Sequence, residues 1–158
     1  MANEYLKRTP TSTGNRRVFT WSGWVKLNNP EGSAPLSLFT GGVYDAGVSN
    51  GGDRGILDFD TTGQLRFGFN NSGWNLSSST ERYRDVGNWS HVILSVNLPD
   101  TEVSAYVNGV KVELSSVSWP AIVNNVWNTS GRITSIGNAY GVVANGAFMN
   151  GEMFDIFM

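Results

Sequence analysis

The sequence predicts an all-β fold built as a two-layer antiparallel sandwich, and three observations lead to this expectation. Gly, Ser, Asn and Thr supply 64 of the 158 residues, and these types favour turns and polar strand faces over helix interiors. Short apolar runs recur along the chain with turn residues between them. No segment of 12 or more residues keeps the 3.6-residue apolar period of a helix.

The expected strands are short and are separated by Gly, Asn, Asp or Ser. They cover residues 18–27, 35–39, 55–60, 64–70, 89–97, 103–107, 110–114, 132–136 and 152–158.

The clearest unit is a hairpin over residues 103–114. Asn108-Gly109 suits the two positive φ angles of a type I′ turn, which sets Val107 opposite Val110 and Ala105 opposite Val112. Val103, Leu114 and these four residues share one face of the hairpin, and polar residues alternate with them. One side of this strand pair should therefore be buried.

Two further patterns support the sandwich. Residues 57–60 and 64–69 form a second hairpin, with Asp60 bonding the turn backbone and Gly63 supplying a left-handed residue. In the strand 18–27, alternation places Trp21 and Trp24 on opposite faces. Trp24 is then either covered by a loop or partner, or a platform for a ligand.

Length, charge and composition exclude several classes. A chain of 158 residues fits one domain, so residues 1–158 should form a single sandwich. The net charge of −2 gives no field for gathering a polyanion, which argues against nucleic-acid binding. Without cysteine there is no disulfide, thiol nucleophile or Cys-based zinc site. We expect no membrane partner, because no secretory signal or long apolar run is present.

Five motifs in order carry a family resemblance. They lie at residues 19–26 (FTWSGWVK), 88–92 (NWSHV), 105–109 (AYVNG), 136–137 (IG) and 148–155 (FMNGEMFD). Together they resemble the laminin-G-like, concanavalin A-like lectin/glucanase domains. Residues 5–17 and 83–89 are similar to the version of this domain in tailed-bacteriophage virion proteins. The resemblance implies a jelly roll of two curved antiparallel sheets, used as a carbohydrate-binding or structural module and only in some branches as an enzyme.

The acidic residues do not predict catalysis. A glycosidase needs two carboxylates flanking the sugar bond. Asp58 with Asp60, and Asp100 with Glu102, have i, i+2 spacing, but the second pair straddles a turn. Asp60 is explained as a turn residue, and the Asp58–Asp60 segment lacks the glutamates of the glucanase relatives' catalytic strand. We therefore expect no catalytic residue and no enzymatic activity.

His91, the single histidine, excludes any site that needs two imidazoles. No Ser-centred nucleophile motif accompanies it. On the strand 89–97 it shares a face with Trp89 and Ile93, and the resemblance implies a Trp-x-His used for packing. We interpret it as a hydrogen-bonded structural imidazole.

Calcium is the one cofactor that the sequence raises. Residues 41–55 form the longest irregular stretch, and loops of this length are more often functional than idle. Asp45 and Asp53 lie within it, hard oxygen ligands suit Ca²⁺, and some laminin-G relatives hold this ion. Against a site, only two carboxylates are offered, both lie in ordinary turn sequences, and Arg54 would repel a cation beside Asp53.

Sugar binding requires an aromatic face for the apolar side of the ring and polar groups for the hydroxyls. Tyr44, Trp74 and Tyr140 lie in surroundings rich in Gly, Asn and Ser and are the candidates. The alternative is that the aromatic residues anchor the core, as most do in a β-sandwich.

Two function classes remain. In the first, the chain is a non-catalytic bacteriophage virion structural protein, a capsid decoration or tail fibre module. It would be made in the host cytoplasm and would contact other virion proteins or itself, with a homotrimer as the expected assembly. Fewer than 20 residues precede the first expected strand, which favours a compact decoration unit or an excised domain over a long fibre. In the second class, the chain is a lectin that recognises host or environmental glycans. We favour the first, because no stretch of sequence gathers the groups of a sugar pocket.

Overall fold

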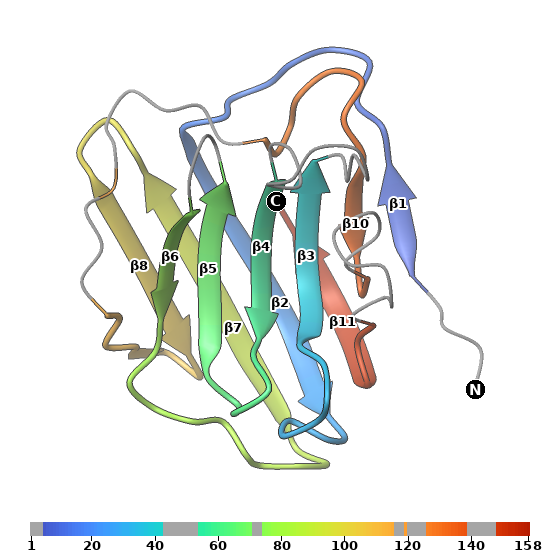
Figure 1. The fold of residues 1–158 in the computed structure, drawn as a ribbon, viewed down its shortest axis with the longest axis vertical. Coiled ribbons are helices and arrows are strands. Elements are labelled where there is room, and N and C mark those ends of the chain that lie inside the picture. Colours follow the sequence, from blue (N-terminus) through green and yellow to red (C-terminus); the bar gives the residue numbers. More distant parts are fainter. Residues whose placement is uncertain (1–4, 43–53, 71–73, 116–118, 120–125, 139–147) are drawn as a thin grey trace.

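The computed structural model describes residues 5–42, 54–70, 74–115, 119, 126–138 and 148–158, and these form two stacked antiparallel sheets (Figure 1). The six-stranded sheet has the order β1-β10-β3-β4-β5-β6, and the five-stranded sheet has the order β11-β2-β7-β8-β9. The strands are β1 Leu6–Arg8, β2 Val18–Leu27, β3 Leu36–Gly42, β4 Arg54–Phe59, β5 Leu65–Asn70, β6 Trp74–Ser78, β7 Trp89–Asn97, β8 Glu102–Val107, β9 Val110–Lys111, β10 Thr134–Ile136 and β11 Gly151–Phe157. The predicted all-β jelly-roll sandwich is confirmed.

The described part of the chain contains no helix long and apolar enough to cross a membrane.

The core lies between the inward faces of the two sheets. Alternation along β2 turns Trp21 and Val25 inward, and alternation along β7 does the same for Val92 and Leu94; all four side chains are fully buried. Trp127 fills the core between the sheets, where its ring contacts those of other aromatic residues. These are Phe19, Phe39 and Phe67, with centroids 5.1, 4.8 and 5.4 Å from that of Trp127.

Most strand boundaries agree with the sequence pattern. The bounds of β2 and β7 are those predicted, because each strand alternates an apolar inward face with a mixed outward face. β1 and β6 were not predicted. At three residues, LKR is too short to show a pattern, so pairing with β10 is what makes β1 a strand. The sequence WNLSS alternates, and β6 pairs with the strand before it, β5.

The type I′ hairpin between β8 and β9 is confirmed. Asn108 and Gly109 have φ angles of 51° and 79°, and Val107 pairs with Val110. The backbone N–H of Val112 donates to the carbonyl of Ala105 at 2.9 Å. Val110, expected on the buried face, is exposed, because it directly follows the turn at the end of the hairpin.

The positive φ at Gly109 gives a stability prediction. Gly109→Val is expected to lower the free energy of unfolding by about 1 kcal/mol or more, since a β-branched residue resists this conformation. No atom lies within 4 Å of where a Cβ would be, so the loss would be conformational and not a clash. Urea unfolding measures the loss, and Gly109→Asn, which tolerates positive φ, is the matched control. Equal stability of the valine variant and the parent would contradict the turn assignment.

Candidate functional site

The outward face of the five-stranded sheet carries aromatic residues that the core does not use. On β7 the inward positions hold Val92 and Leu94, so Trp89 and His91 point outward. On β2 Trp24 is outward for the same reason, as the sequence predicted. The face is therefore partly apolar although it does not contribute to the buried core.

These side chains belong to three neighbouring strands, β11, β2 and β7. Figure 1 shows the three strands in this order. Phe154 of β11 is the Cα partner of Trp24, which in turn is the partner of His91. The rings of Trp24 and His91 are stacked at 4.9 Å with an interplanar angle of 23°. Trp89 meets Phe154 edge to face at 6.2 Å. We call Phe154, Trp24, His91 and Trp89 the aromatic row.

Two members of the aromatic row are open to solvent: Phe154 is 60% exposed and Trp89 is 41% exposed. Trp24 and His91 are half-buried. An open hollow of about 900 Å³ adjoins the exposed pair and is lined by both rings, by Glu152 and by Tyr5. Its volume lies within the range of ligand-binding clefts, roughly 300–1,000 Å³.

Polar groups stand beside the rings. Lys26 Nζ donates to Glu152 Oε1 at 2.9 Å, next to Trp89 in the strand register. Ser22 Oγ and His91 Nε2 are hydrogen-bonded at 2.8 Å, and the backbone N–H of His91 donates to Asn108 Oδ1. The prediction that His91 is a hydrogen-bonded imidazole is thus confirmed. The hydrogen bond to Ser22 orients the His91 ring against Trp24.

The aromatic row can bind a ligand with an apolar face and polar edges. Its rings are held on paired strands, so little conformational freedom is lost when a flat molecule stacks on them. The ammonium of Lys26, the carboxylate of Glu152 and the hydroxyl of Ser22 supply donors and acceptors beside the rings. Exposed aromatic rings bordered by such groups offer the apolar and polar contacts that a sugar ring can make.

The sugar candidates from the sequence lie elsewhere. Tyr44 and Tyr140 fall outside the described residues. Trp74 starts β6 in the six-stranded sheet, is 43% exposed, and has the guanidinium of Arg54 4.9 Å from its ring centroid. Trp74 and the aromatic row therefore belong to different sheets, and the structure does not bring them into one site.

The calcium candidates Asp45 and Asp53 also lie outside the described residues, so this site stays a prediction. In the rest of the chain, as far as the structure describes it, no three His, Asp or Glu side chains come together as metal ligands.

Asp58 and Arg66 form a buried ion pair on β4 and β5. Arg66 Nε and Nη2 donate to the two carboxylate oxygens of Asp58, both at 2.8 Å. Burial raises the pKa of Asp58, and the hydrogen bonds and charge of Arg66 oppose that rise. Both carboxylate oxygens of Asp58 thus have a structural partner in Arg66.

Asp60 organises the turn between β4 and β5, as predicted. Its Oδ1 accepts hydrogen bonds from the backbone N–H groups of Thr62 and Gln64 and from the Thr62 hydroxyl, at 2.8 to 3.0 Å. Desolvation acts to raise the pKa of Asp60, but these hydrogen bonds outweigh it and hold the pKa below its ordinary value. Gly63 supplies the left-handed residue with a φ of 82°.

The lowered pKa gives a pH-dependent prediction. Asp60→Ala is expected to lower the free energy of unfolding at pH 7 by about 1–2 kcal/mol, because three hydrogen bonds to a carboxylate are lost. A carboxylate whose pKa is lowered by folding stabilises the folded state at pH values above its unfolded-state pKa of 3.8. This stabilisation is lost as the pH falls through the folded-state pKa. The gap between parent and variant should therefore shrink as the pH falls from about 5 to 2. Urea titrations at several pH values measure it, and a gap independent of pH would contradict the assignment.

Sequence reasoning left open whether Trp24 is covered by a loop or partner or is a ligand platform, and it did not raise Trp89 or Phe154 as site residues. For Trp89 the signal was present, since it shares its outward face with His91 on a strand whose other face is apolar. For Phe154 no local signal exists, because its position depends on β11 pairing with β2.

Residues 2–156 match a laminin-G family described as the concanavalin A-like lectin/glucanases superfamily. Among curated proteins, none matches this sequence significantly. Domains LG4-5 of the mouse laminin alpha1 chain share 14% identity with a TM-score of 0.67, covering 98% of this chain and 39% of that one.

Two bacterial structures are similar as well. The CBM40 of the Ruminococcus gnavus IT-sialidase, bound to alpha2,3 sialyllactose, has a TM-score of 0.67 and 14% identity over 96% of this chain and 91% of that one. A Bacteroides ovatus protein described as a candidate carbohydrate-binding protein has a TM-score of 0.66 and 21% identity over 98% of this chain and 40% of that one. This chain thus spans about two fifths of the laminin and Bacteroides structures. At these identities the similarity to solved structures shows the fold alone. Because the family match covers nearly the whole length, the chain belongs to the concanavalin A-like lectin/glucanase superfamily.

Proposed function

We propose that the chain is a non-catalytic carbohydrate-binding module whose site is the aromatic row on the five-stranded sheet. The observation that carries this proposal is the set of aromatic rings placed outward on three adjacent strands, with Phe154 and Trp89 open to solvent. Core packing does not account for them, because the inward face has its own aromatic residues.

Two further features support the proposal. The hollow beside Trp89 and Phe154 is large enough for a sugar residue, and Lys26 and Glu152 border the rings with charged groups that hydrogen-bond hydroxyls. The similar bacterial structures include a module solved with sialyllactose, which makes glycan recognition the function to test first.

Truncating an exposed ring of the row should weaken glycan binding. Trp89→Ala and Phe154→Ala are each expected to raise the Kd for a glycan identified on an array by about tenfold or more, as for an aromatic anchor at an interface. Calorimetric titration of parent and variants measures the change. Both side chains are substantially exposed, so circular dichroism and melting temperature should show a folded protein.

Trp74→Ala is the matched control, because Trp74 has similar exposure but belongs to the other sheet. Unchanged affinity in this variant, together with loss in Trp89→Ala, supports the aromatic row. The reverse result would place the glycan at Trp74 and contradict the proposed site. An array without any bound glycan would contradict the proposed function.

A second candidate function is a structural one, in which the chain acts through protein–protein contacts. Exposed apolar residues around β1 and β11 favour it, since clusters of such residues commonly mark interaction surfaces. A virion building block of the kind that the phage resemblance implies would use this surface. Binding to capsids or fibres that competing glycans do not displace would support it.

A further inference from the structure

β1 and β11 are the terminal strands of their sheets on the same side of the sandwich, and they run in the same direction (Figure 1). We call the surface formed by these two strands and the cleft between them the open side. Leu6 on β1 is 68% exposed and Phe157 on β11 is 62% exposed. Terminal strands also present unpaired backbone N–H and C=O groups, which invite pairing with another chain.

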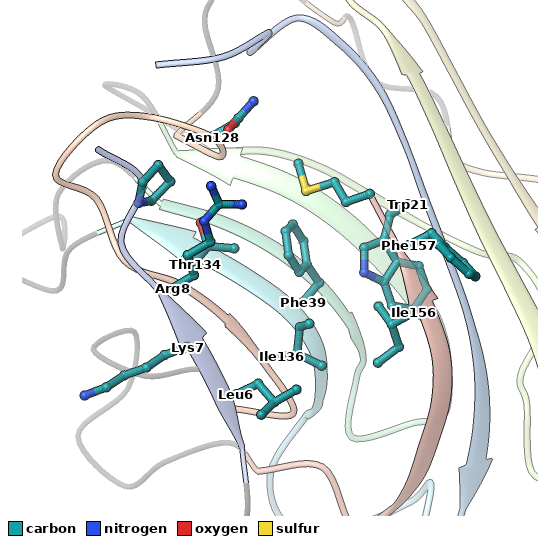
Figure 2. Close-up of a pocket in the computed structure, with 12 residues that line it drawn as sticks. Leu6, Lys7, Arg8, Trp21, Phe39, Asn128, Thr134, Ile136, Ile156 and Phe157 are labelled. Carbon is teal, nitrogen blue, oxygen red and sulfur yellow. The ribbon is translucent and has the colours of Figure 1, made fainter. Parts of the chain in front are cut away.

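The cleft of the open side has a volume of about 250 Å³ and lies between the two sheets (Figure 2). Trp21 and Phe39 reach it from the core, and Leu6, Ile136 and Ile156 line it nearer the surface. Its lining is therefore mainly apolar. A partner that covered it would remove apolar surface from water, which is the main favourable contribution to association.

The two terminal strands carry opposite charges. β1 contains Lys7 and Arg8, and β11 contains Glu152 and Asp155. Glu152 is paired with Lys26, whereas Arg8 and Asp155 have no ion-pair partner among the residues that the structure describes. One side of the molecule thus presents both a basic and an acidic strand, which makes this side complementary to itself.

We propose that the open side is the interface of a two-fold symmetric dimer, in which β1 of one copy faces β11 of the other. A two-fold axis parallel to the strands brings these edges together twice, in an isologous contact. Arg8 on β1 and Asp155 on β11 carry the opposite charges that this contact would bring together. Each Arg8 would then meet the Asp155 of the other copy.

The charges also select this arrangement over its alternative. A two-fold axis perpendicular to the sheets would set β1 against β1 and β11 against β11, and so bring like charges together. In the proposed dimer the charges are complementary and the two apolar clefts face each other. Leu6, Ile136 and Ile156 line both this cleft and the hollow beside the aromatic row. The assembly goes beyond glycan binding, and its test requires no ligand.

Sedimentation velocity over a range of protein concentrations tests the proposal. We expect a reversible monomer–dimer equilibrium. Leu6→Ser and Phe157→Ser should each raise the dimer Kd by about tenfold or more, because two copies of the side chain leave the interface. Val110→Ser is the matched control: Val110 is equally exposed but lies on β9, at the far edge of the five-stranded sheet, and its substitution should leave the Kd unchanged.

A double-mutant cycle tests the ion pair directly. Arg8→Gln and Asp155→Asn should each raise the dimer Kd by a few-fold. The dimer Kd of the double variant should be no higher than the higher of the two single-variant values. Asparagine tolerates the φ of 54° at position 155. The proposal would be overturned by a monomer at every concentration, by a trimer, by additive effects of the two substitutions, or by an equal effect of Val110→Ser.

Discussion

Replacing Trp127 by alanine is expected to lower the free energy of unfolding by about 3–5 kcal/mol, a large effect for a single substitution. Trp127 is almost fully buried, and its ring contacts the rings of Phe19, Phe39 and Phe67. Alanine would remove all of these contacts and leave a cavity between the sheets that the rigid strands fill only in part.

Two glycines make room for the Trp127 ring, so neither can be replaced by a larger residue without a clash. Gly41 and Gly55 are cross-strand partners on β3 and β4, and the indole lies against both. A Cβ at Gly55 would lie 2.7 Å from Trp127 Nε1, and one at Gly41 would overlap the ring. Gly41→Val should therefore also destabilise the fold.

Urea unfolding measures both variants, and Trp74→Ala, which removes an exposed tryptophan, is the control for losing an indole. A loss below about 1 kcal/mol for Trp127→Ala would show that this ring does not hold the sheets together.

Removing Arg66 is expected to cost about 3 kcal/mol or more, because it leaves the buried carboxylate of Asp58 without its counter-charge. Burial already raises the pKa of Asp58, and loss of Arg66 would raise it further. A pKa above the unfolded value of 3.8 means that the folded state binds the proton more tightly. Arg66→Met should therefore be least stable, relative to the parent, near neutral pH and should recover as the pH falls.

The double variant Asp58→Leu with Arg66→Met serves as the control. It removes both charges, so it should be more stable at pH 7 than Arg66→Met alone. Unfolding curves at several pH values test this pair of expectations. A double variant less stable than the single one would show that the charges themselves are needed, and not only their mutual compensation.

The local parts of the fold could be predicted because local chemistry determines them. The strand at residues 18–27 and the turn at Asn108-Gly109 follow from alternation and from positive φ angles, which neighbouring residues decide. β6 was missed although it pairs with β5, the strand directly before it. β1 could not be predicted, because its partner β10 lies far from it in the sequence. The same holds for Trp127, whose burial depends on glycines on β3 and β4.

The candidate site was predictable in part for the same reason. The outward direction of Trp24 and the hydrogen-bonded role of His91 follow from alternation within their own strands. The stacking of these two rings depends on the register between β2 and β7, and Phe154 joins them only because β11 pairs with β2. A row built from three strands far apart in the sequence leaves no local pattern.

Titration of an isotope-labelled protein with the glycan that binds most tightly on an array tests the proposed site most directly. Each of the six tryptophans gives one indole N–H signal in a two-dimensional NMR spectrum, and single Trp→Phe variants assign the signals of Trp24, Trp74 and Trp89. We predict that the signals of Trp24 and Trp89 shift in a saturable way while that of Trp74 stays in place. A saturable shift of the Trp74 signal, with those of Trp24 and Trp89 unchanged, would contradict a binding site on the five-stranded sheet.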